Sequence, residues 1–448
     1  MFPLRNPDDV TDLNWLFLDL NSYFASVEQQ AQPALRGRPV IVTPVDSPYT
    51  SAIAASYEAK AMGIGTGISV REARQRCPDI AVVLARHDVY VEYHHRIIHE
   101  IEQHLHVTKV CSIDEVACLL LGPERIPDNA VKLALAVQKG IMRNVGQCLT
   151  SSVGIAPSKL LAKTASDMKK PNGLTVLTRD ALPGPLLTLK LTDIAGIASG
   201  IERRLNRCGI HTVEAFWNLS PNRARAVWGS IEGERFWYAL HGIDPPDIIT
   251  KRGSISHSHV LAPELRPPAM AHQVARRLVA KAAARMRQTG YRTAGLSVST
   301  RSETRQSWGN DCCFTATDNT FALLRSLDQL WSERPGTISQ DPIKKVGIVL
   351  CRLTPTSDDM PDLFGHIQEV QTDAVRDADK QGNNAGQTQK PDNAKATKRE
   401  HALSLALDRI NQRFGKDSIL VGPSAKLPDF VGAKIAFNRI PEQKDFLN

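Results

Sequence analysis

The chain has 448 residues and a mass of 49.3 kDa, which is too much for one ordinary hydrophobic core, so we expect several domains. Its formal net charge of +8 and isoelectric point near 9.0 favour a polyanionic partner. Because no N-terminal targeting signal and no run of 18 apolar residues is recognised, we expect a cytoplasmic protein without a membrane span. The eight cysteines form no CxxC pair, which argues against a zinc site or a disulfide framework.

The first part of the chain predicts one sheet with an insertion. Residues 12–22 indicate a strand, and residues 83–178 indicate further strands and helices. Between them, residues 23–82 are rich in helical patterns broken by prolines and glycines. Acidic residues of the first and the third segment have to meet in the site argued below, so we expect both segments to share a sheet and residues 23–82 to be an insertion.

The second part predicts a change of architecture. Residues 179–245 are mostly helical, residues 246–257 are typical of a linker, and residues 258–356 alternate helix and strand patterns. Residues 357–448 form a tail. Its stretch from 365 to 400 has the composition of a disordered segment, and a helical period resumes over 401–414. The chain as a whole is therefore expected to be an α+β multidomain protein.

Three carboxylates fall in apolar surroundings. An apolar run ends on Asp19, and a later apolar region is interrupted by Asp114 and Glu115. Unpaired buried anions are costly unless a partner charge, strong hydrogen bonds or a metal compensates them. Two Mg²⁺ ions about 4 Å apart would do so and would build a site for in-line phosphoryl transfer. The alternative is that these are solvated acids at strand ends.

The neighbouring acids Asp114 and Glu115 need a special backbone position to share a metal. Successive residues of a strand point to opposite faces, so the two can meet an ion together only at a hairpin end or a twisted edge. Apolar runs flank the short polar segment 112–115 on both sides, up to 111 and from 116 to 121. This pattern favours the end of a hairpin.

Three sequence blocks carry a resemblance. DLNSYFASVE, SIDE and GIAPSKLLAKTASDMKKPNG, the last at residues 154–173, resemble the signature blocks of Y-family, lesion-bypass DNA polymerases of the bacterial polymerase IV and V type. The match runs in order across about residues 15–356. It implies a template-directed, error-prone DNA polymerase. The alternative is a non-catalytic scaffold that binds DNA and recruits another polymerase or the sliding clamp.

The resemblance also implies a right-hand architecture with an added domain. A palm of mixed or antiparallel sheet plus helices would comprise 12–22 and 83–178, and small fingers would comprise 23–82. A helical thumb with a helix-hairpin-helix element would follow over 179–245, and an α/β little finger over 258–356. The remaining segments would be the linker 246–257 and the partly disordered tail 357–448.

The resemblance assigns the metal ligands and a steric gate. Asp19, Asp114 and Glu115 would hold two Mg²⁺ ions, with Mn²⁺ as a substitute, and the backbone carbonyl of Leu20 would be a further ligand. Phe24 would be the aromatic gate on which the sugar of the incoming deoxynucleoside triphosphate rests. Tyr23, beside it, is assigned to the nucleotide site, with ordinary core packing as the alternative.

Cationic and hydroxyl groups are expected to hold the triphosphate. Tyr57 and Lys60 are three residues apart and so lie on one side of a helical turn. They match the family's pair of a Tyr with an Arg or Lys, and Lys170 matches a further phosphate-contacting lysine. The alternative for each lysine is a solvated side chain.

Two segments are expected to contact primer-template DNA. The run 191–220 reads as helix, Gly-containing turn and helix, and it resembles the thumb element whose turn, here with Gly196 and Gly200, binds a DNA phosphate. Ala198 stands where the family has a glycine. The second segment is a helix over 273–290 that carries basic residues and resembles part of the little finger, with a solvated face as the alternative. The residues assigned to DNA on it are Arg276, Arg277, Lys281 and Arg285.

The tail offers two partner predictions. MPDLF at 360–364 resembles the peptide by which bacterial polymerases dock on the sliding clamp, with Met360 in place of the usual Gln and with Leu363 and Phe364 as its apolar residues. A loosely packed loop is the alternative. The last blocks of the chain resemble tails of polymerase V type relatives, which suggests an accessory protein. Otherwise the chain is expected to be a monomer.

Overall fold

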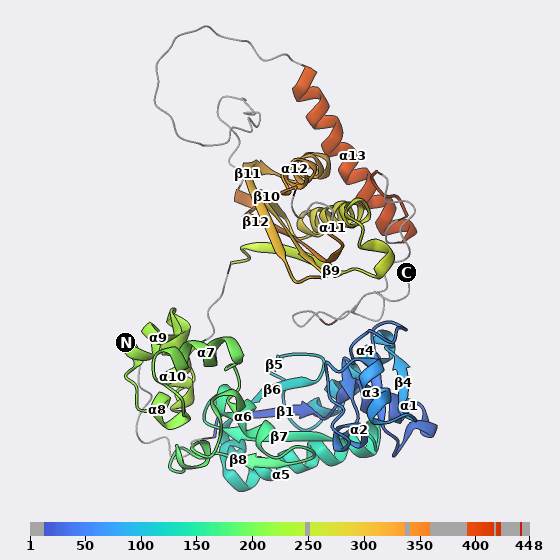
Figure 1. The fold of residues 1–448 in the computed structure, drawn as a ribbon. Coiled ribbons are helices and arrows are strands. Elements are labelled where there is room, and N and C mark those ends of the chain that lie inside the picture. Colours follow the sequence, from blue (N-terminus) through green and yellow to red (C-terminus); the bar gives the residue numbers. More distant parts are fainter. Residues whose placement is uncertain are drawn as a thin grey trace. The chain divides into compact units, whose positions relative to one another are not determined.

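The structure, a computed structural model, describes residues 13–246, 251–336, 341–358, 392–415, 418–422 and 440. These residues fall into two compact units. The first contains the described residues up to 246 together with Ile440, and the second contains those from 251 to 422. Figure 1 labels the elements of both. In the part of the chain so described, no helix is long and apolar enough to cross a membrane.

The first unit is built on a five-stranded sheet with the order β5-β6-β1-β7-β8. The central strand β1 runs antiparallel to both of its neighbours, and β8 is parallel to β7. The first strand and the later segment therefore share one sheet, as expected. The strands are β1 (Trp15–Leu20), β5 (Lys109–Val110), β6 (Glu115–Leu119), β7 (Ser151–Ala156) and β8 (Leu174–Val176).

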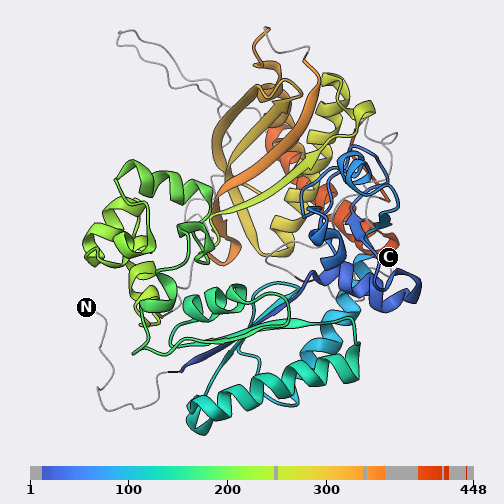
Figure 2. The ribbon, with the colours of Figure 1, turned by 60° about the horizontal axis from the view of Figure 1, so that its bottom comes forward.

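Both faces of this sheet are covered by helices, and the alternation of side chains along β1 assigns a core to each face. Leu16 and Leu18 belong to the core that contains residues of α1 (Tyr23–Ala31), α4 (His87–Glu102) and α5 (Pro127–Gly140). Trp15 and Phe17 belong to the core of α6 (Lys159–Met168). Figure 2 shows α6 and α5 on opposite sides of the sheet. Asp19 is two residues after Phe17 on the same strand, so its side chain belongs to the face that α6 covers.

The inserted segment carries its own small sheet, with the order β3-β2-β4. Its strands are β2 (Val40–Thr43), β3 (Ala54–Ala55) and β4 (Ala81–Leu84), and its helices are α2 (Tyr57–Ala61) and α3 (Val70–Arg76). Ile41 and Ile64 lie in its core. β4 continues to Leu84, which pairs with Thr43, so the inserted segment extends past the expected boundary at residue 82.

Residues 179–245 are helical, as expected. The helices are α7 (Ser199–Arg207), α8 (Val213–Trp217), α9 (Pro221–Trp228) and α10 (Ile231–Leu240). The hydroxyls of Thr212 and Ser220 accept a backbone N–H at the starts of α8 and α9, which explains why these helices begin there. Leu205 and Phe216 share a core with α6 of the preceding segment.

The second unit packs helices on one four-stranded antiparallel sheet with the order β11-β10-β12-β9. Leu278, Val298 and Leu327 lie in its core, which joins helix and sheet. The strands are β9 (Ser254–Val260), β10 (Tyr291–Ser302), β11 (Ser307–Thr317) and β12 (Ile343–Pro355), and the helices are α11 (Pro268–Gln288), α12 (Thr320–Ser332) and α13 (Asp392–Phe414).

Two expectations about the edges of this unit were wrong. Residues 254–257 belong to β9 and pair with β12, although they were assigned to the linker. Ile255 is the one core residue among residues 254–257, so the alternation of apolar and polar residues that indicates a strand was weak there. α13 begins at Asp392 inside a segment with a disordered composition. Its Glu400 binds Asn319 and Arg325 of the α12 region, and such pairing over a long sequence distance is invisible in composition.

Short helical turns complete the described chain. One of them, η3 (Ile141–Val145), is a π-helical turn that continues α5. The 3₁₀ turns are η1 (Pro33–Leu35), η2 (Gly122–Arg125), η4 (Gly184–Leu186), η5 (Leu191–Asp193), η6 (Pro263–Leu265) and η7 (Thr356–Asp358).

Candidate active site

The three predicted carboxylates come together at one end of the central sheet. Asp19 of β1 pairs directly with Glu115 of β6, so their side chains leave the same face, the one that α6 covers. Asp114 lies in the turn before β6, and its backbone carbonyl accepts a hydrogen bond from Leu20 N at 2.8 Å. The neighbouring acids therefore lie at a hairpin end, as expected.

The hairpin that carries Asp114 is held from two sides. The Ser112 hydroxyl donates to Asp114 Oδ1 at 2.5 Å. On the other side, Nδ1–H of the buried His94 donates to the Ile113 carbonyl at 2.8 Å. Burial lowers the pKa of His94 to about 4, despite the opposing effect of this hydrogen bond. His94 is therefore neutral at pH 7 and acts as a fixed support for the turn.

Lys163 of α6 bridges two of the three acids. Its ammonium lies 2.5 Å from Asp19 Oδ2 and 2.8 Å from Glu115 Oε1. It also lies 3.3 Å from Asp167 Oδ2, one helical turn further along α6. The Lys163 side chain is only 20% exposed, so these contacts are poorly screened by solvent.

Local sequence places α6 close enough for this bridge. The Ser158 hydroxyl accepts Leu161 N at 3.2 Å and so caps the start of the helix. Gly154 of β7 has no side chain, and a Cβ there would lie 2.0 Å from the Ala162 carbonyl oxygen. The glycine therefore allows the helix to lie directly against the strand.

Lys170 provides a second cation on the same acids. Its ammonium lies 2.8 Å from Asp19 Oδ1 and 2.8 Å from Asp167 Oδ1. Burial lowers the pKa of Lys163 and of Lys170, but Asp19 and the other neighbouring carboxylates outweigh it and raise both values. Both lysines are therefore charged at neutral pH.

The acids of the cluster are still incompletely compensated. Burial raises the pKa of Asp114, the Ser112 hydrogen bond opposes this, and the charges of Asp19 and Glu115 raise it further. Four carboxylates, those of Asp19, Asp114, Glu115 and Asp167, face the two ammonium groups of Lys163 and Lys170. The cluster thus keeps a negative excess.

This donor set fits a hard divalent cation such as Mg²⁺, which prefers carboxylate and carbonyl oxygens. The Lys163 ammonium already stands as a cation between Asp19 and Glu115. Within the described ranges, no three acidic, thiol or imidazole groups are arranged around a common point for an ion. Groups that could bind such an ion are thus present, but two of them are turned towards the lysine.

The two aromatic residues at the start of α1 have different surroundings. The Phe24 ring is stacked on Tyr90, with ring centroids 4.4 Å apart and an interplanar angle of 18°. Tyr23 is 3% exposed, and its hydroxyl donates to the Tyr90 backbone carbonyl at 2.6 Å. The Tyr23 side chain therefore packs in the core, and its assignment to the nucleotide site stays a prediction.

A buried ion pair supports the ring behind Phe24. Glu28 is fully buried and accepts hydrogen bonds from Nε and Nη2 of Arg86 and, at 2.8 Å, from the Tyr90 hydroxyl. Glu28 follows Phe24 by one turn of α1, so the two side chains lie on the same side of the helix. The same carboxylate thus ties α1 to α4 and orients the ring on which Phe24 rests.

The predicted phosphate-binding pair lies on α2, whose start is capped by the Ser56 side chain. Lys60 Nζ lies 4.4 Å from the centre of the Tyr57 ring and donates to the Ser22 hydroxyl at 2.7 Å. Burial is the main cause that lowers the pKa of Lys60, and the positive charge of Lys170 lowers it further. Lys60 and Lys170 are thus close enough to repel one another.

The two predicted DNA-binding glycines precede and begin α7. Gly196 has φ +91°, which a residue with a side chain rarely adopts, so it fits a tight turn. Gly200 lies in the first turn of α7, and a Cβ there would extend into open space. Ala198 provides no side-chain cap, so a phosphate could take that role at this helix start.

Each of the four basic residues of α11 that were assigned to DNA is at least partly buried in the second unit. Arg276 is paired with Asp328 of α12, and Arg277 is buried. Lys281 and Arg285 are only half-buried, but they lie near His257 of β9 and, after burial, are further causes that lower its pKa. Their surroundings come from the packing of α11 on the sheet and on α12, and their assignment to DNA stays a prediction.

The predicted clamp-binding residues Met360, Leu363 and Phe364 lie outside the described residues.

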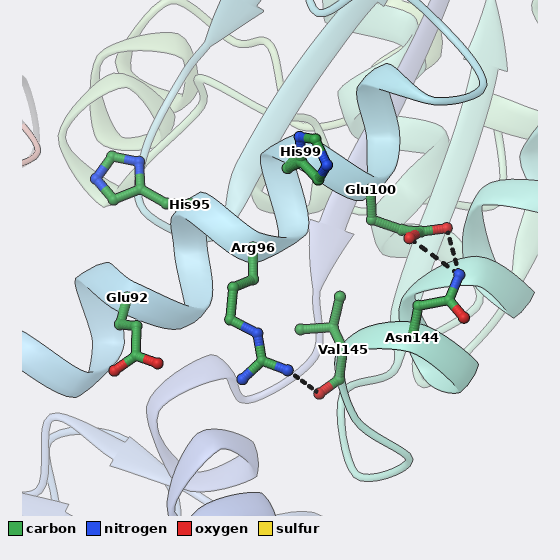
Figure 3. Close-up of a pocket in the computed structure, with 7 residues that line it drawn as sticks. All are labelled: Glu92, His95, Arg96, His99, Glu100, Asn144 and Val145. Carbon is green, nitrogen blue, oxygen red and sulfur yellow. Dashed lines mark hydrogen bonds between the residues drawn. The ribbon is translucent and has the colours of Figure 1, made fainter.

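A cavity of about 570 Å³ lies beside α4 and η3, and none of the three carboxylates lines it. Figure 3 shows its side chains diverging: Arg96 donates to the Val145 carbonyl, and Asn144 donates to Glu100. Arg96, Glu100 and Asn144 bind other protein groups, and the lining side chains do not converge on a common point. It therefore offers no chemistry comparable to that of the acidic cluster.

Lys163 and Asp167 were missed as site residues, although both lie in a block that carries the family resemblance. Their only signal was an (i, i+4) pair of opposite charges on a predicted helix, which is usually a solvated pair. The bridge from Lys163 to Asp19 depends on the close packing of α6 on β7, which the sequence alone does not reveal.

Comparisons with known proteins identify the family of the chain. The chain matches the impB/mucB/samB family over residues 18–167 and the C-terminal domain of that family over residues 252–363. DNA polymerase IV of Moorella thermoacetica is 33% identical over 373 residues, which are 80% of this chain and 90% of that protein. DNA polymerase IV of Pelotomaculum thermopropionicum is 30% identical over 418 residues, which are 90% and 94%.

Solved structures of similar fold include the following one. A chimeric Y-family DNA polymerase has a TM-score of 0.61 and 22% sequence identity, over 76% of this chain and 99% of that chain.

Proposed function

We propose how this chain, which belongs to the Y family of DNA polymerases, carries out DNA-directed DNA synthesis. It extends a primer with deoxynucleoside triphosphates, including opposite damaged template bases. The observation that carries the proposal is the meeting of Asp19, Asp114 and Glu115 on one side of a sheet end, with an uncompensated negative charge.

In this proposal the acidic cluster is the catalytic centre. Asp19, Asp114, Glu115 and the carbonyl of Leu20 would hold two Mg²⁺ ions, or Mn²⁺ in their place. Such ions lower the pKa of a primer 3′-hydroxyl and stabilise charge on the leaving pyrophosphate. The turn held by His94 and Ser112 keeps Asp114 in position beside Glu115.

The cationic groups near the cluster would bind the nucleotide. Lys170 and Lys60 would contact the phosphates, and the Tyr57 hydroxyl would donate a hydrogen bond to them. Lys60 is a point charge without the two-pronged fork of an arginine, so it positions a phosphate less strictly. The Phe24 ring, held by Tyr90, would exclude a ribose 2′-hydroxyl by contact.

The units would divide the work as in a right hand. Residues 13–22 and 85–178 would form the palm, 23–84 the fingers, 179–246 the thumb, and the second unit the little finger. Primer-template DNA would be held mainly through phosphates, in part by the turn with Gly196 and Gly200, so its affinity would fall steeply with salt. The tail, with its peptide at Met360–Phe364, would contact the sliding clamp or an accessory protein.

The alternative of a non-catalytic scaffold is disfavoured because such a protein has no use for three acids that meet at a buried turn.

The decisive test is Asp114→Ala. Loss of a metal-holding carboxylate should reduce primer extension by about 10³-fold or more, because metal stabilisation of the transition state is worth several kcal/mol. Binding of primer-template DNA, measured by fluorescence anisotropy, should stay within about twofold, since phosphate contacts supply the affinity. Asp128→Ala, which removes an exposed acid from α5, is the matched control and should extend normally. Unchanged extension by the Asp114 variant would favour the scaffold.

Phe24→Ala tests the gate. Removing the ring should raise the incorporation of ribonucleotides relative to deoxyribonucleotides, by about tenfold or more if a steric clash of at least 1.4 kcal/mol is lost. Phe24→Tyr keeps the ring and should retain the discrimination. The measurement is kcat/KM for each sugar in single-nucleotide extension. Equal discrimination in the Ala variant and the parent would reject the role of Phe24.

A further inference from the structure

Lys163 occupies a position that the proposed function requires for something else. Its ammonium lies between Asp19 Oδ2 and Glu115 Oε1, at 2.5 and 2.8 Å. Both oxygens belong to the acids assigned to the metal. A Mg²⁺ ion binds oxygen at about 2.1 Å, so an ion held by the same two oxygens would lie in the space of the ammonium. The lysine and the ion therefore exclude one another at these atoms.

The chain also provides the place to which Lys163 can withdraw. Asp167 lies one turn further along α6 and is already 3.3 Å from the Lys163 ammonium. The flexible stem of lysine allows this shift without a movement of the helix. In the structure, however, Asp167 is shared with Lys170, whose ammonium lies 2.8 Å from Asp167 Oδ1 and 2.8 Å from Asp19 Oδ1.

A nucleotide changes this balance. Its triphosphate is a stronger anion for Lys170 than a shared carboxylate, so Lys170 would leave Asp167 and Asp19 when the nucleotide binds. Asp167 is then free to accept Lys163, and Asp19 and Glu115 are free for the ion. Two lysines and one carboxylate thus connect the metal ligands to the phosphates.

We propose that Lys163 competes with a divalent ion for Asp19 and Glu115, and that this competition makes tight metal binding depend on the nucleotide. The inference rests on the proposed function, because it takes the acidic cluster as the metal site. Lys163 is a positioning residue here, because its ammonium excludes an ion from Asp19 and Glu115 until the nucleotide has bound. Since coupling between two sites is reciprocal, the ion strengthens nucleotide binding by the same factor.

The test is Lys163→Met, which keeps most of the volume of the side chain and removes its charge. Binding of Mn²⁺ alone to the full chain, without DNA or nucleotide, is measured by electron paramagnetic resonance of the free ion. The variant should bind Mn²⁺ more tightly by about tenfold, within the range usual for coupled sites. Lys159→Met is the matched control, because that lysine lies on the same helix with its ammonium 5.4 Å from the centre of the Trp15 ring. It should bind as the parent does.

A second variant should act in the opposite direction. Asp167→Asn removes the anion to which Lys163 withdraws, so the lysine stays on Asp19 and Glu115 and Mn²⁺ binding should weaken. In the double variant with Lys163→Met, the Asn substitution should lose this effect, because no ammonium is left to be held. A purely structural role of Asp167 would weaken binding equally in both backgrounds.

The coupling itself is measured with a non-hydrolysable deoxynucleoside triphosphate, after correction for the ion that the nucleotide binds in a titration without protein. The parent should bind Mn²⁺ more tightly with the nucleotide than without it, and Lys163→Met should show less than half of this gain on a logarithmic scale. Circular dichroism melting establishes that each variant is folded.

The outcomes separate the inference from the function on which it rests. If Lys163→Met binds Mn²⁺ as weakly as the parent or more weakly, the competition is overturned while the metal site stands. If neither protein binds Mn²⁺ with or without nucleotide, the metal site and the inference both fall.

Discussion

Charged side chains serve opposite purposes in the two units. In the first unit, acids from β1, the β5–β6 turn and α6 meet with fewer cations than anions. In the second unit, Arg276 and Arg287 of α11 are each matched with an acid of another helix. An excess of one sign in a buried place is costly for folding and indicates binding or catalysis, whereas matched pairs join elements.

The clearest matched group surrounds Arg287. Its guanidinium donates to Asp408 of α13 at 2.7 and 2.9 Å, and also to the Asp318 carbonyl and the Thr320 hydroxyl at the start of α12. One side chain of α11 thus holds both other helices of the unit. Bidentate pairing of this kind requires arginine and not lysine.

The largest stability effect should come from breaking this group. Arg287→Met should lower the free energy of unfolding by about 3 kcal/mol, because it leaves Asp408 without its partner in a mostly buried place. Urea unfolding followed by circular dichroism measures the change. Combining it with Asp408→Leu should recover part of the loss, since the unpaired charge is then gone. If the double variant loses as much unfolding free energy as Arg287→Met alone, the cause is packing and not charge.

A middle-sized effect should appear on acidification in the first unit. His94 has a folded pKa of about 4 against 6.5 for the free group, so its contribution to stability is present above pH 6.5 and is lost as the pH falls towards 4. Between about pH 7 and pH 5 this amounts to about 2 kcal/mol. His94→Gln keeps a neutral donor for the Ile113 carbonyl and does not titrate. Urea unfolding at both pH values should therefore show the parent losing more stability than this variant, and equal losses would refute the assignment.

The smallest of these effects should be an increase in the free energy of unfolding, and it sharpens the contrast between the units. The folded state raises the pKa of Asp114, so at neutral pH the ionised group opposes folding. Asp114→Asn in a buffer with a chelator should therefore increase the free energy of unfolding by about 0.5 kcal/mol, at the low end of stabilising substitutions. Asp79→Asn, at an exposed site in a turn outside any helix, should leave it unchanged. Destabilisation by the Asp114 substitution would show that the carboxylate is already well compensated.

The sequence predicted the acidic cluster because its geometry follows from local rules. The alternation along β1 assigns Asp19 to one face, and the apolar runs around residues 112–115 predict the hairpin that presents Asp114. The roles of these residues stay a prediction. To predict that they meet, it was enough to know the alternation of side chains along a strand and the position of one turn.

The surroundings of α11 and of Lys163 depend on contacts that no local rule supplies. A helix with many basic residues is usually a solvated face, but α11 packs against α12 and is paired with α13 through Arg287. The acids that match Arg276 and Arg287 lie 52 and 121 residues further along the chain. Likewise, Lys163 and Asp167 have the spacing of a solvated (i, i+4) pair, and only the packing of α6 against β7 brings Lys163 to Asp19. Tertiary packing decided both cases.

The support of Phe24 has a consequence for the selectivity of the enzyme. The ring lies against Tyr90, which the buried Glu28 and Arg86 hold in turn, so this wall is rigid and apolar. A flat hydrocarbon surface recognises shape and offers no hydrogen bond by which to tell one nucleobase from another. If Phe24 is the gate that we propose, the penalty for a ribonucleotide should therefore be the same for all four bases.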